Sequence, residues 1–559
     1  MRQRMYDECH SPRRSGTRLL RWLAQAGLAS AVLVSGGCVT TGPLQWIRNG
    51  FKVGPNYCRP PVPVAEEWIE AKDSKVQSRP MQDWWQLFND ATLNSLIQTA
   101  YEQNVTLRVA GTRVLEARAQ QAIAVGSIFP QTQQATGQYS RVALSHTTFN
   151  NPAQLAALSP TPAPPGALIG NYTSDWSGGF NLSWELDFWG RFRRNIESAN
   201  ANLDASVENY DDALVTLLAD VATNYVQYRV AQQRIKIARA NVKIQQDILA
   251  LVEEQFQVGI NKVTQLDVAQ ARTALAQTRS TIPALEIALG QANDTLCILL
   301  GIPPRDLGPE LGSGPDLDTG PIPNMPTWVA AGVPADLLRR RPDVRSAERQ
   351  VAAQSAQIGV AEADLYPAIF INGTLGYEAS DLSKLFESRS FMGTITPNFK
   401  WNILNYGRIA NNVRLQEART QELIATYQNR VLTAAREAQT ALRSFLRSQE
   451  QAAELARSVQ AAAAATQIGV RQYKAGTVPF NTVFNLETTQ VQQEDNLAVA
   501  QGNIAFNLIA VYRALGGGWE FRLHENCAAS PRMDAPGPTE VPLASGPEQL
   551  PAPTATEPK

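Results

Sequence analysis

The chain has 559 residues, with 50 Lys and Arg against 51 Asp and Glu and a formal net charge of -1. This balance offers no broad basic surface, so we predict no nucleic-acid partner. The five cysteines and three histidines show no metal-ligand spacing, so we predict neither a metal site nor a cofactor.

Residues 1–37 resemble a secretory signal peptide. A basic start precedes an apolar run at 27–34, and small residues at 35–37 lead directly to Cys38. The arrangement is similar to a bacterial lipoprotein signal, which predicts that Cys38 is lipidated and begins the mature chain. Cleavage by an ordinary signal peptidase, with Cys38 unmodified, is the alternative.

We predict that residues 38–90 form a lipidated N-terminal arm. Prolines at positions 55, 60, 61 and 63 exclude a helix there, and aromatic residues follow around Trp84 and Trp85. We therefore expect an extended arm packed on the surface of the main body.

Two long helical patterns dominate the rest of the chain. An apolar 3-4 stripe runs from Val207 to Phe256, and a matching stripe runs from Ile424 to Tyr473, 217 residues later. A helix of about 65 residues is about 100 Å long, more than an ordinary globular domain needs. We therefore predict an internal duplication, with repeats at 91–300 and 335–518, a linker at 301–334 and a largely disordered segment at 519–559.

A shorter helix and a pair of strands are predicted to precede each long helix. The shorter helices are expected at about 93–127 and 335–365. Strict alternation of apolar and polar residues predicts strands at 176–188, 369–377 and 391–403, and a weaker one after Pro130. Such strands are typical of an outer-membrane β-barrel, although a sheet packed on a soluble core is the alternative.

The predicted strands are too few to close a barrel. Known barrels have at least eight strands, so a chain with four must assemble with copies of itself. The fold class predicted is mainly α with a β-barrel portion, built on long duplicated coiled-coil helical hairpins.

Several motifs carry a family resemblance. They are Val53-Gly54-Pro55-Asn56-Tyr57, Asp83-Trp84-Trp85, Leu337 to Val344, Leu365-Tyr366-Pro367, Gly190-Arg191 and Gly407-Arg408. Together they span residues 53 to about 519, and the chain resembles the TolC-like outer-membrane efflux proteins, in particular their lipoprotein branch. The resemblance implies a homotrimer with a 12-stranded barrel in outer-membrane lipid, to which each chain contributes four strands, and a periplasmic α-barrel formed by the hairpins. It also implies a periplasmic adaptor and an inner-membrane pump as partners.

The resemblance also implies site residues at the two hairpin turns. Adaptor contacts fall on Gly259, Thr264, Leu266, Gly476, Phe480 and Val483. The glycines also let the chain reverse, whatever else they do. A gate falls on Phe484 and Asn485, where Asn485 stands in place of the family's aspartate. The alternative for Asn485 is a buried register-setting position against a neighbouring helix.

No catalytic constellation is predicted, so we expect no enzyme. The Arg339-Arg340-Arg341 run is interpreted as a solvated or packed helix start, and the Asp and Glu residues of the rods as their outer face. The function predicted is an outer-membrane, lipid-anchored export duct for small molecules. A protein-secretion channel and, on weaker grounds, a structural coiled-coil lipoprotein are the alternatives.

Overall fold

The computed structural model describes residues 42–70, 73, 75–77, 81–143, 172–259, 263–311, 322–323, 325–332 and 334–525. The chain divides into two units, Met1–Trp519 and Glu520–Lys559. The second unit contains the short helix α12 (Phe521–Glu525). The predicted signal peptide, Cys38 and residues 526–559 of the predicted disordered segment lie outside the described residues.

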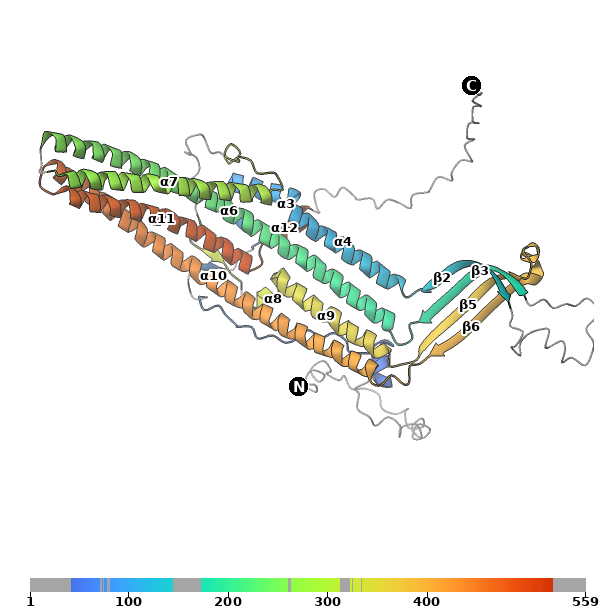
Figure 1. The fold of residues 1–559 in the computed structure, drawn as a ribbon. Helices are drawn as coiled ribbons and strands as arrows, with labels where there is room; N and C mark the ends of the chain where they lie inside the picture. Colours follow the sequence, from blue (N-terminus) through green and yellow to red (C-terminus); the bar gives the residue numbers. More distant parts are fainter. Residues whose placement is uncertain are drawn as a thin grey trace, which may run out of the picture. The chain divides into compact units, whose positions relative to one another are not determined.

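Two long hairpins form the body of the first unit, as predicted (Figure 1). The first joins α6 (Arg191–Val258) to α7 (Gln265–Leu299), and the second joins α10 (Arg408–Lys474) to α11 (Phe480–Ala514). Most positions of the two predicted stripes are buried, which confirms the 3-4 pattern. The buried members include Leu214, Leu217, Val221, Tyr228, Ala231, Ile235, Val252, Tyr427, Val431, Ala434, Ala438, Phe445 and Tyr473.

Each shorter helix is interrupted where the prediction had it continuous. Residues 93–127 form α3 (Ala91–Gln103) and α4 (Val105–Gly126), separated by Asn104 in an extended conformation. The Asn104 side chain accepts a hydrogen bond from the Leu107 amide and donates one to the Leu299 carbonyl, 2.8 Å in each case. The break therefore caps α4 and ties it to the end of α7.

The second shorter helix is broken by proline. A 3₁₀ turn η2 (Pro334–Asp336) and α8 (Leu337–Arg340) precede α9 (Pro342–Ala363), with Pro342 at the first position of α9. Arg341 caps the helix and pairs with Asp343 and Glu437, at 2.8 Å for each pair. This part of the arginine run is thus a packed helix start, one of the two forms predicted.

The four-stranded sheet lies at the end of the hairpins opposite their turns (Figure 1). Its antiparallel order is β2 (Thr132–Ala143), β3 (Tyr172–Leu186), β5 (Ala368–Ala379) and β6 (Phe391–Lys400). The weak strand after Pro130 is confirmed as β2. Pro397 is accommodated within the single chain because β6 is its edge strand, where a missing amide donor costs no ladder bond in the sheet of that chain.

One face of the sheet is apolar, as the alternation predicts. Phe180 is paired with Leu375, and Ile395 lies on the next strand of the same face; their exposed fractions are 67%, 53% and 80%. On the other face, Asn181 donates to Thr136 and Ser183 donates to Asn372. The described part of the single chain therefore leaves a large apolar sheet surface uncovered.

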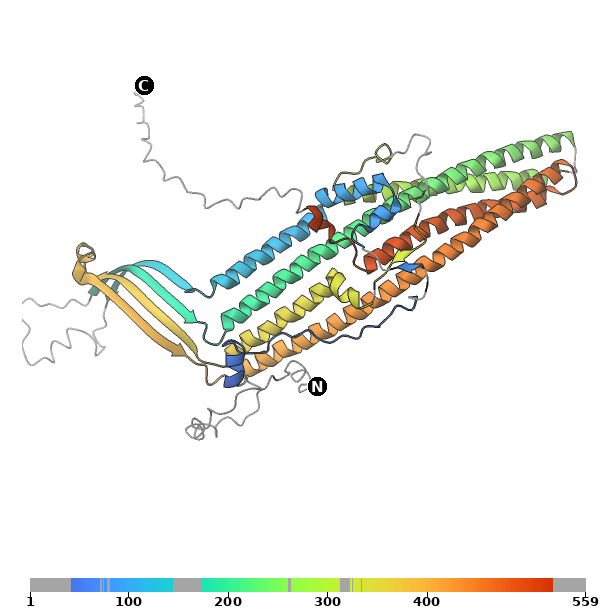
Figure 2. The ribbon, with the colours of Figure 1, turned by 180° about the vertical axis from the view of Figure 1, so that it is seen from behind.

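The N-terminal arm lies along the helices of the first unit, as predicted, but it contains elements that sequence reasoning missed (Figure 2). A short helix α2 (Pro43–Arg48) precedes the proline-rich stretch. Farther on, β1 (Val76–Gln77) pairs in parallel with β4 (Val329–Ala330) of the linker. The 3₁₀ helix η1 (Trp84–Phe88) buries its aromatic rings.

Two more 3₁₀ turns, η3 (Leu382–Lys384) and η4 (Ser388–Ser390), connect β5 to β6.

Within the described ranges, no helix combines the length and the apolar character needed to cross a membrane.

Candidate functional site

The helical tip is built by two glycine turns. Gly259 and Gly476 both have a φ of +72°, a left-handed conformation that glycine adopts without strain. The turns end α6 and α10 at the pole farthest from the strands (Figure 1). At the start of α7, Thr264 and Asp267 form a reciprocal capping box.

An apolar cluster, here called the tip cluster, joins all four long helices just behind the turns. Its members are Val252, Val268, Ala271, Tyr473, Phe480 and Val483. Phe480 and Val483 are only 3% and 1% exposed. Their side chains therefore hold the two hairpins together and do not contribute to the outer tip surface of the single chain.

The outer surface of the tip has a different set of apolar side chains. Leu266 is 65% exposed in the first turn of α7, and Val258 is 63% exposed in the last turn of α6. Sequence reasoning named Leu266 and missed Val258. These two exposed aliphatic side chains, at the ends of α6 and α7 that meet at the turn, offer a small apolar surface that a partner can cover.

The predicted gate residues occupy different environments. The Phe484 ring is partly buried against the tip cluster and lies 6.5 Å from the Phe480 ring, centroid to centroid. Asn485 is exposed, and its neighbour one turn on, Thr489, donates to the Asn485 carbonyl at 2.8 Å. Within one chain, Asn485 is thus not packed into a buried helix contact.

Polar side chains line the seam, by which we mean the contact between α6 and α11. Arg234 makes two hydrogen bonds to Asp495, at 2.7 and 3.0 Å, and Asn241 donates to Glu494 at 3.1 Å. Closer to the tip, the buried polar side chains of the seam no longer have all their hydrogen-bond partners. Gln245 and Glu487 are 6% and 7% exposed, and each has an acceptor oxygen with no hydrogen-bond partner in the described part of the chain.

Burial raises the pKa of Glu487 to about 7. A carboxylate oxygen without a donor is costly in such a place, so the neutral form is favoured. Glu487 and the fully buried Asp211 contradict the expectation that the acidic residues of the rods all face outward. The 3-4 spacing of Phe480, Val483 and Glu487 places them on one face of the helix, so the sequence already indicated that Glu487 faces the same buried side as the two apolar residues.

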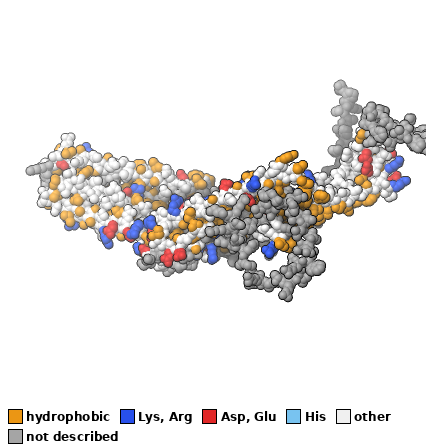
Figure 3. Space-filling model, turned by 90° about the horizontal axis from the view of Figure 1, so that it is seen from below, with side chains coloured by type: hydrophobic (Ala, Val, Ile, Leu, Met, Phe, Trp, Pro, Cys, Tyr) orange, Lys and Arg blue, Asp and Glu red, His pale blue; other side chains and the backbone are white. Residues whose placement is uncertain are grey.

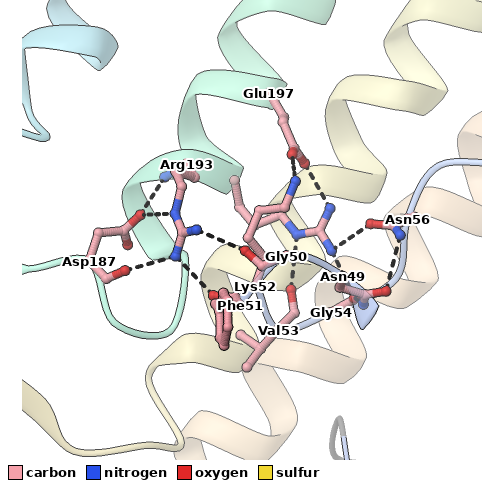
Figure 4. A network of polar contacts seen from close by, with 11 residues as sticks. Asn49, Gly50, Phe51, Lys52, Val53, Gly54, Asn56, Asp187, Arg193 and Glu197 are labelled. Carbon is pink, nitrogen blue, oxygen red and sulfur yellow. Dashed lines mark hydrogen bonds and ion pairs between the residues drawn. The ribbon is translucent and has the colours of Figure 1, made fainter. Parts of the chain in front are cut away.

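A second polar network fastens the N-terminal arm where the strands meet the helices (Figure 4). Arg194, 2% exposed, donates to the Val53 and Gly54 carbonyls at 2.9 Å each and to Asn56 at 3.1 Å. It also pairs with Glu197 at 2.7 Å. One buried guanidinium therefore satisfies several acceptors of the arm.

The neighbouring side chains extend this network. Glu197 also binds Lys52. Burial alone would raise the pKa of Glu197, but hydrogen bonds from Lys52 and Arg194 outweigh it and hold the pKa below its usual value. The Arg193 guanidinium likewise donates hydrogen bonds to the Asp187 carboxylate and to the Gly50 and Phe51 carbonyls (Figure 4).

A glycine contact explains why the arm lies so close to α9. A Cβ on Gly54 would be 2.4 Å from the Gly359 Cα, and one on Gly359 would be 2.8 Å from the Val53 carbonyl oxygen. Neither position has room for a side chain. The Val53-Gly54-Pro55 motif is therefore an anchoring point of the arm.

Comparison with known proteins gives a consistent result. The sequence model of the family described as "Outer membrane efflux protein" matches residues 96–302 and 333–517, well over half of the chain. The chain is 31% identical over 455 residues to the pyoverdine export outer membrane protein OpmQ of Pseudomonas putida, covering 81% of this chain and 92% of that protein. It is 29% identical over 497 residues to the probable outer membrane lipoprotein SilC of Salmonella typhimurium, covering 88% and 98%.

Solved structures agree with the sequence matches. The outer-membrane channel OprN superposes with a TM-score of 0.74 at 31% identity, covering 84% of this chain and 99% of that one. CusC, solved in a study of folding and transmembrane channel formation, gives a TM-score of 0.68 at 28% identity.

Proposed function

The chain belongs to the outer membrane efflux protein family, and from this premise we infer that it is the outer-membrane channel of a tripartite efflux system. Members of this family are channel proteins. The chain is a passive duct for small molecules, coupled through a periplasmic adaptor to an inner-membrane pump.

One observation supports this function above the others, namely the incomplete sheet. Among the described residues of the single chain, the outer edges of β2 and β6 have no strand partner and the apolar face of the sheet is uncovered. Pairing of β6 with β2 of a further copy repeats head to tail and closes when the rotation fits. Three copies supply twelve strands, so we propose a homotrimer.

Lipidation is proposed for Cys38, from its position after the apolar signal. With the barrel, acyl chains on this residue would place the protein stably in the outer membrane. Native mass spectrometry in detergent is expected to show three chains, each with the added mass of lipid on a mature chain that begins at Cys38. A stable monomer would contradict the assembly, whereas an unlipidated trimer would contradict only the anchor.

The adaptor is proposed to bind the outer tip surface. Gly259, Thr264 and Gly476 shape this surface and Leu266 offers it an apolar side chain, while Phe480 and Val483 support it from within. Leu266→Asp places a charge in the contact and is expected to abolish export in cells. Leu266→Met keeps the apolar contact and serves as the matched control.

A loss of export can be assigned to the adaptor contact only if the isolated variant channel still assembles and conducts. Leu266→Asp should leave the trimer and its conductance in planar bilayers intact, because Leu266 is exposed and makes no core contact with the tip cluster. Export at the level of the Leu266→Met variant would reject the adaptor surface.

The aperture is proposed to be formed by Asn485, with Phe484 behind it. Near a threefold axis, three amides hydrogen-bond with one another, whereas three carboxylates repel each other and attract cations. Asn485→Asp is therefore expected to raise cation selectivity and block by divalent ions in bilayer recordings. Asn496→Asp, about 16 Å farther along α11 and on the same face, is the matched control and should change neither. Equal behaviour of both variants and the parent would place the aperture elsewhere.

A further inference from the structure

The short helix α2 has one covered face and one uncovered face. The Trp46 ring packs against Phe188 and Trp189, at centroid distances of 5.2 and 5.5 Å. Leu44 and Ile47, on the other side of the helix, are 72% and 53% exposed. In this helix of six residues, the two aliphatic side chains point outward and the rest of the described chain leaves them largely uncovered.

The position of α2 is fixed by the polar network at the arm. The Gly50 and Phe51 carbonyls, which follow the helix directly, accept hydrogen bonds from Arg193 at 2.9 and 2.8 Å. The Phe51 ring contacts Trp46 edge-on at 4.8 Å and is itself 51% exposed. Phe51 is therefore a further exposed apolar side chain beside α2.

The helix α2 packs directly beside the end of the sheet, through Trp46. Phe188 follows Trp184 and Leu186 in the alternation of β3, so Trp46 packs on the next apolar position after the strand. Trp189 stacks on Tyr366 at 4.5 Å and donates to the Pro367 carbonyl at 2.8 Å, directly before β5. In Figure 3 hydrophobic side chains gather where the helices give way to the strands.

Two further indoles mark the same level of the molecule. Trp184 donates to the Ile128 carbonyl at 2.9 Å, and Trp401 donates to the Leu365 carbonyl at 3.0 Å. Each of these carbonyls lies just before a strand begins. Tryptophans whose N–H group is satisfied while the ring faces apolar surroundings are typical of a membrane–water interface. At the end of α2, exposed Arg48 adds a cation suited to lipid phosphate.

We propose that α2 is an interfacial membrane helix, whose Leu44, Ile47 and Phe51 side chains enter the periplasmic leaflet of the outer membrane. Its occupant is phospholipid, because α2 packs beside the end of the apolar sheet, at the level where Trp184 and Trp401 lie. The proposal rests on the function given above, which places that sheet in the membrane. The helix would hold the foot of each barrel segment to the bilayer, independently of an acyl chain.

Photo-crosslinking tests the contact directly. Benzoyl-phenylalanine is placed at Ile47 in the full-length trimer, which is then reconstituted in vesicles of phosphatidylethanolamine and phosphatidylglycerol and illuminated. We expect a mass increase equal to one phospholipid. Ile395→benzoyl-phenylalanine, on the apolar face of the sheet, is the positive control; Leu432→benzoyl-phenylalanine, 51% exposed on α10, is the negative control.

The two controls separate the possible failures. Lipid adducts at positions 395 and 47, with none at 432, support the proposal. An adduct at 395 without one at 47, or a crosslink from 47 to another protein chain, overturns the interfacial helix and leaves the channel untouched. Absence of an adduct at 395 contradicts the membrane placement of the sheet, and with it the proposed function.

Discussion

Arg194→Met is expected to release the N-terminal arm from the helices. The substitution removes the Arg194 donor from the buried Val53 and Gly54 carbonyls, of which Gly54 keeps its bond from Asn49, and it leaves Glu197 with Lys52. Leaving a buried acceptor without its donor costs about 1–3 kcal/mol. Hydrogen exchange should therefore show residues 49–57 losing protection while the middle of α6 keeps it.

The adjacent arginine provides the control. Arg193 also binds the arm and Asp187, but its side chain is 36% exposed, so water can replace its bonds. Arg193→Met is expected to cost about 1 kcal/mol and to leave the arm largely protected. If Arg194→Met keeps the protection of the parent, the other contacts of the arm, among them Gly54–Gly359, are enough to hold it, and the assigned role of Arg194 is wrong.

Glu487 is expected to make the tip sensitive to pH. The pKa of this carboxyl in the folded tip, about 7, exceeds its ordinary value of 4.5, so the folded tip binds more protons than a separated, hydrated one. Its contribution to the stability of the tip is therefore fully present below about pH 4.5 and is lost as pH rises through 7. At higher pH the ionised group costs about 3 kcal/mol, since one pKa unit corresponds to about 1.4 kcal/mol.

The charged groups nearby do not offset this cost. Lys243 and Asp247 of α6 and Arg471 and Lys474 of α10 are exposed, and Glu494 of α11 is already paired with Asn241. Desolvation is the cause of the shift in the pKa of Glu487. The seam should therefore loosen to hydrate the carboxylate.

The measurement is hydrogen exchange at residues 480–490 between about pH 6 and pH 8, corrected for the intrinsic pH dependence of exchange. Protection should fall with rising pH in the parent and stay constant in Glu487→Gln, which is neutral throughout. A fall of equal size in both proteins would remove Glu487 from the explanation.

The long elements could be predicted because their signals repeat over many residues. The 3-4 stripes of α6 and α10 and the alternation of β3, β5 and β6 each extend over enough positions to fix the type of element. The offset between the Gly190 and Gly407 landmarks supported them further. Such patterns depend only on the chain itself.

What was missed depends on contacts that the sequence does not display. The helix α2 is too short for periodicity, and it is placed by Phe188 and Trp189, more than a hundred residues away. The break at Asn104 is fixed by the Leu299 carbonyl on another helix.

At the candidate site, spacing indicated which turns form the tip but not which side chains face out. Phe480 and Leu266 were predicted alike, yet one is buried and the other exposed. Their difference follows from the packing of one hairpin on the other, a contact between distant parts of the chain. Arg194 was missed for the same reason, because its partners Val53 and Gly54 come from the arm.

The central claim is that copies of this chain enclose a water-filled duct through the outer membrane. Conductance of the purified full-length protein in planar lipid bilayers tests it most directly, with a parallel sample heated until its trimers dissociate. We expect discrete, persistent conductance steps from the trimer and none from the dissociated chains. A correctly assembled, membrane-inserted trimer that passes no current under any condition, including with the Glu487 carboxyl ionised above pH 8, would contradict it.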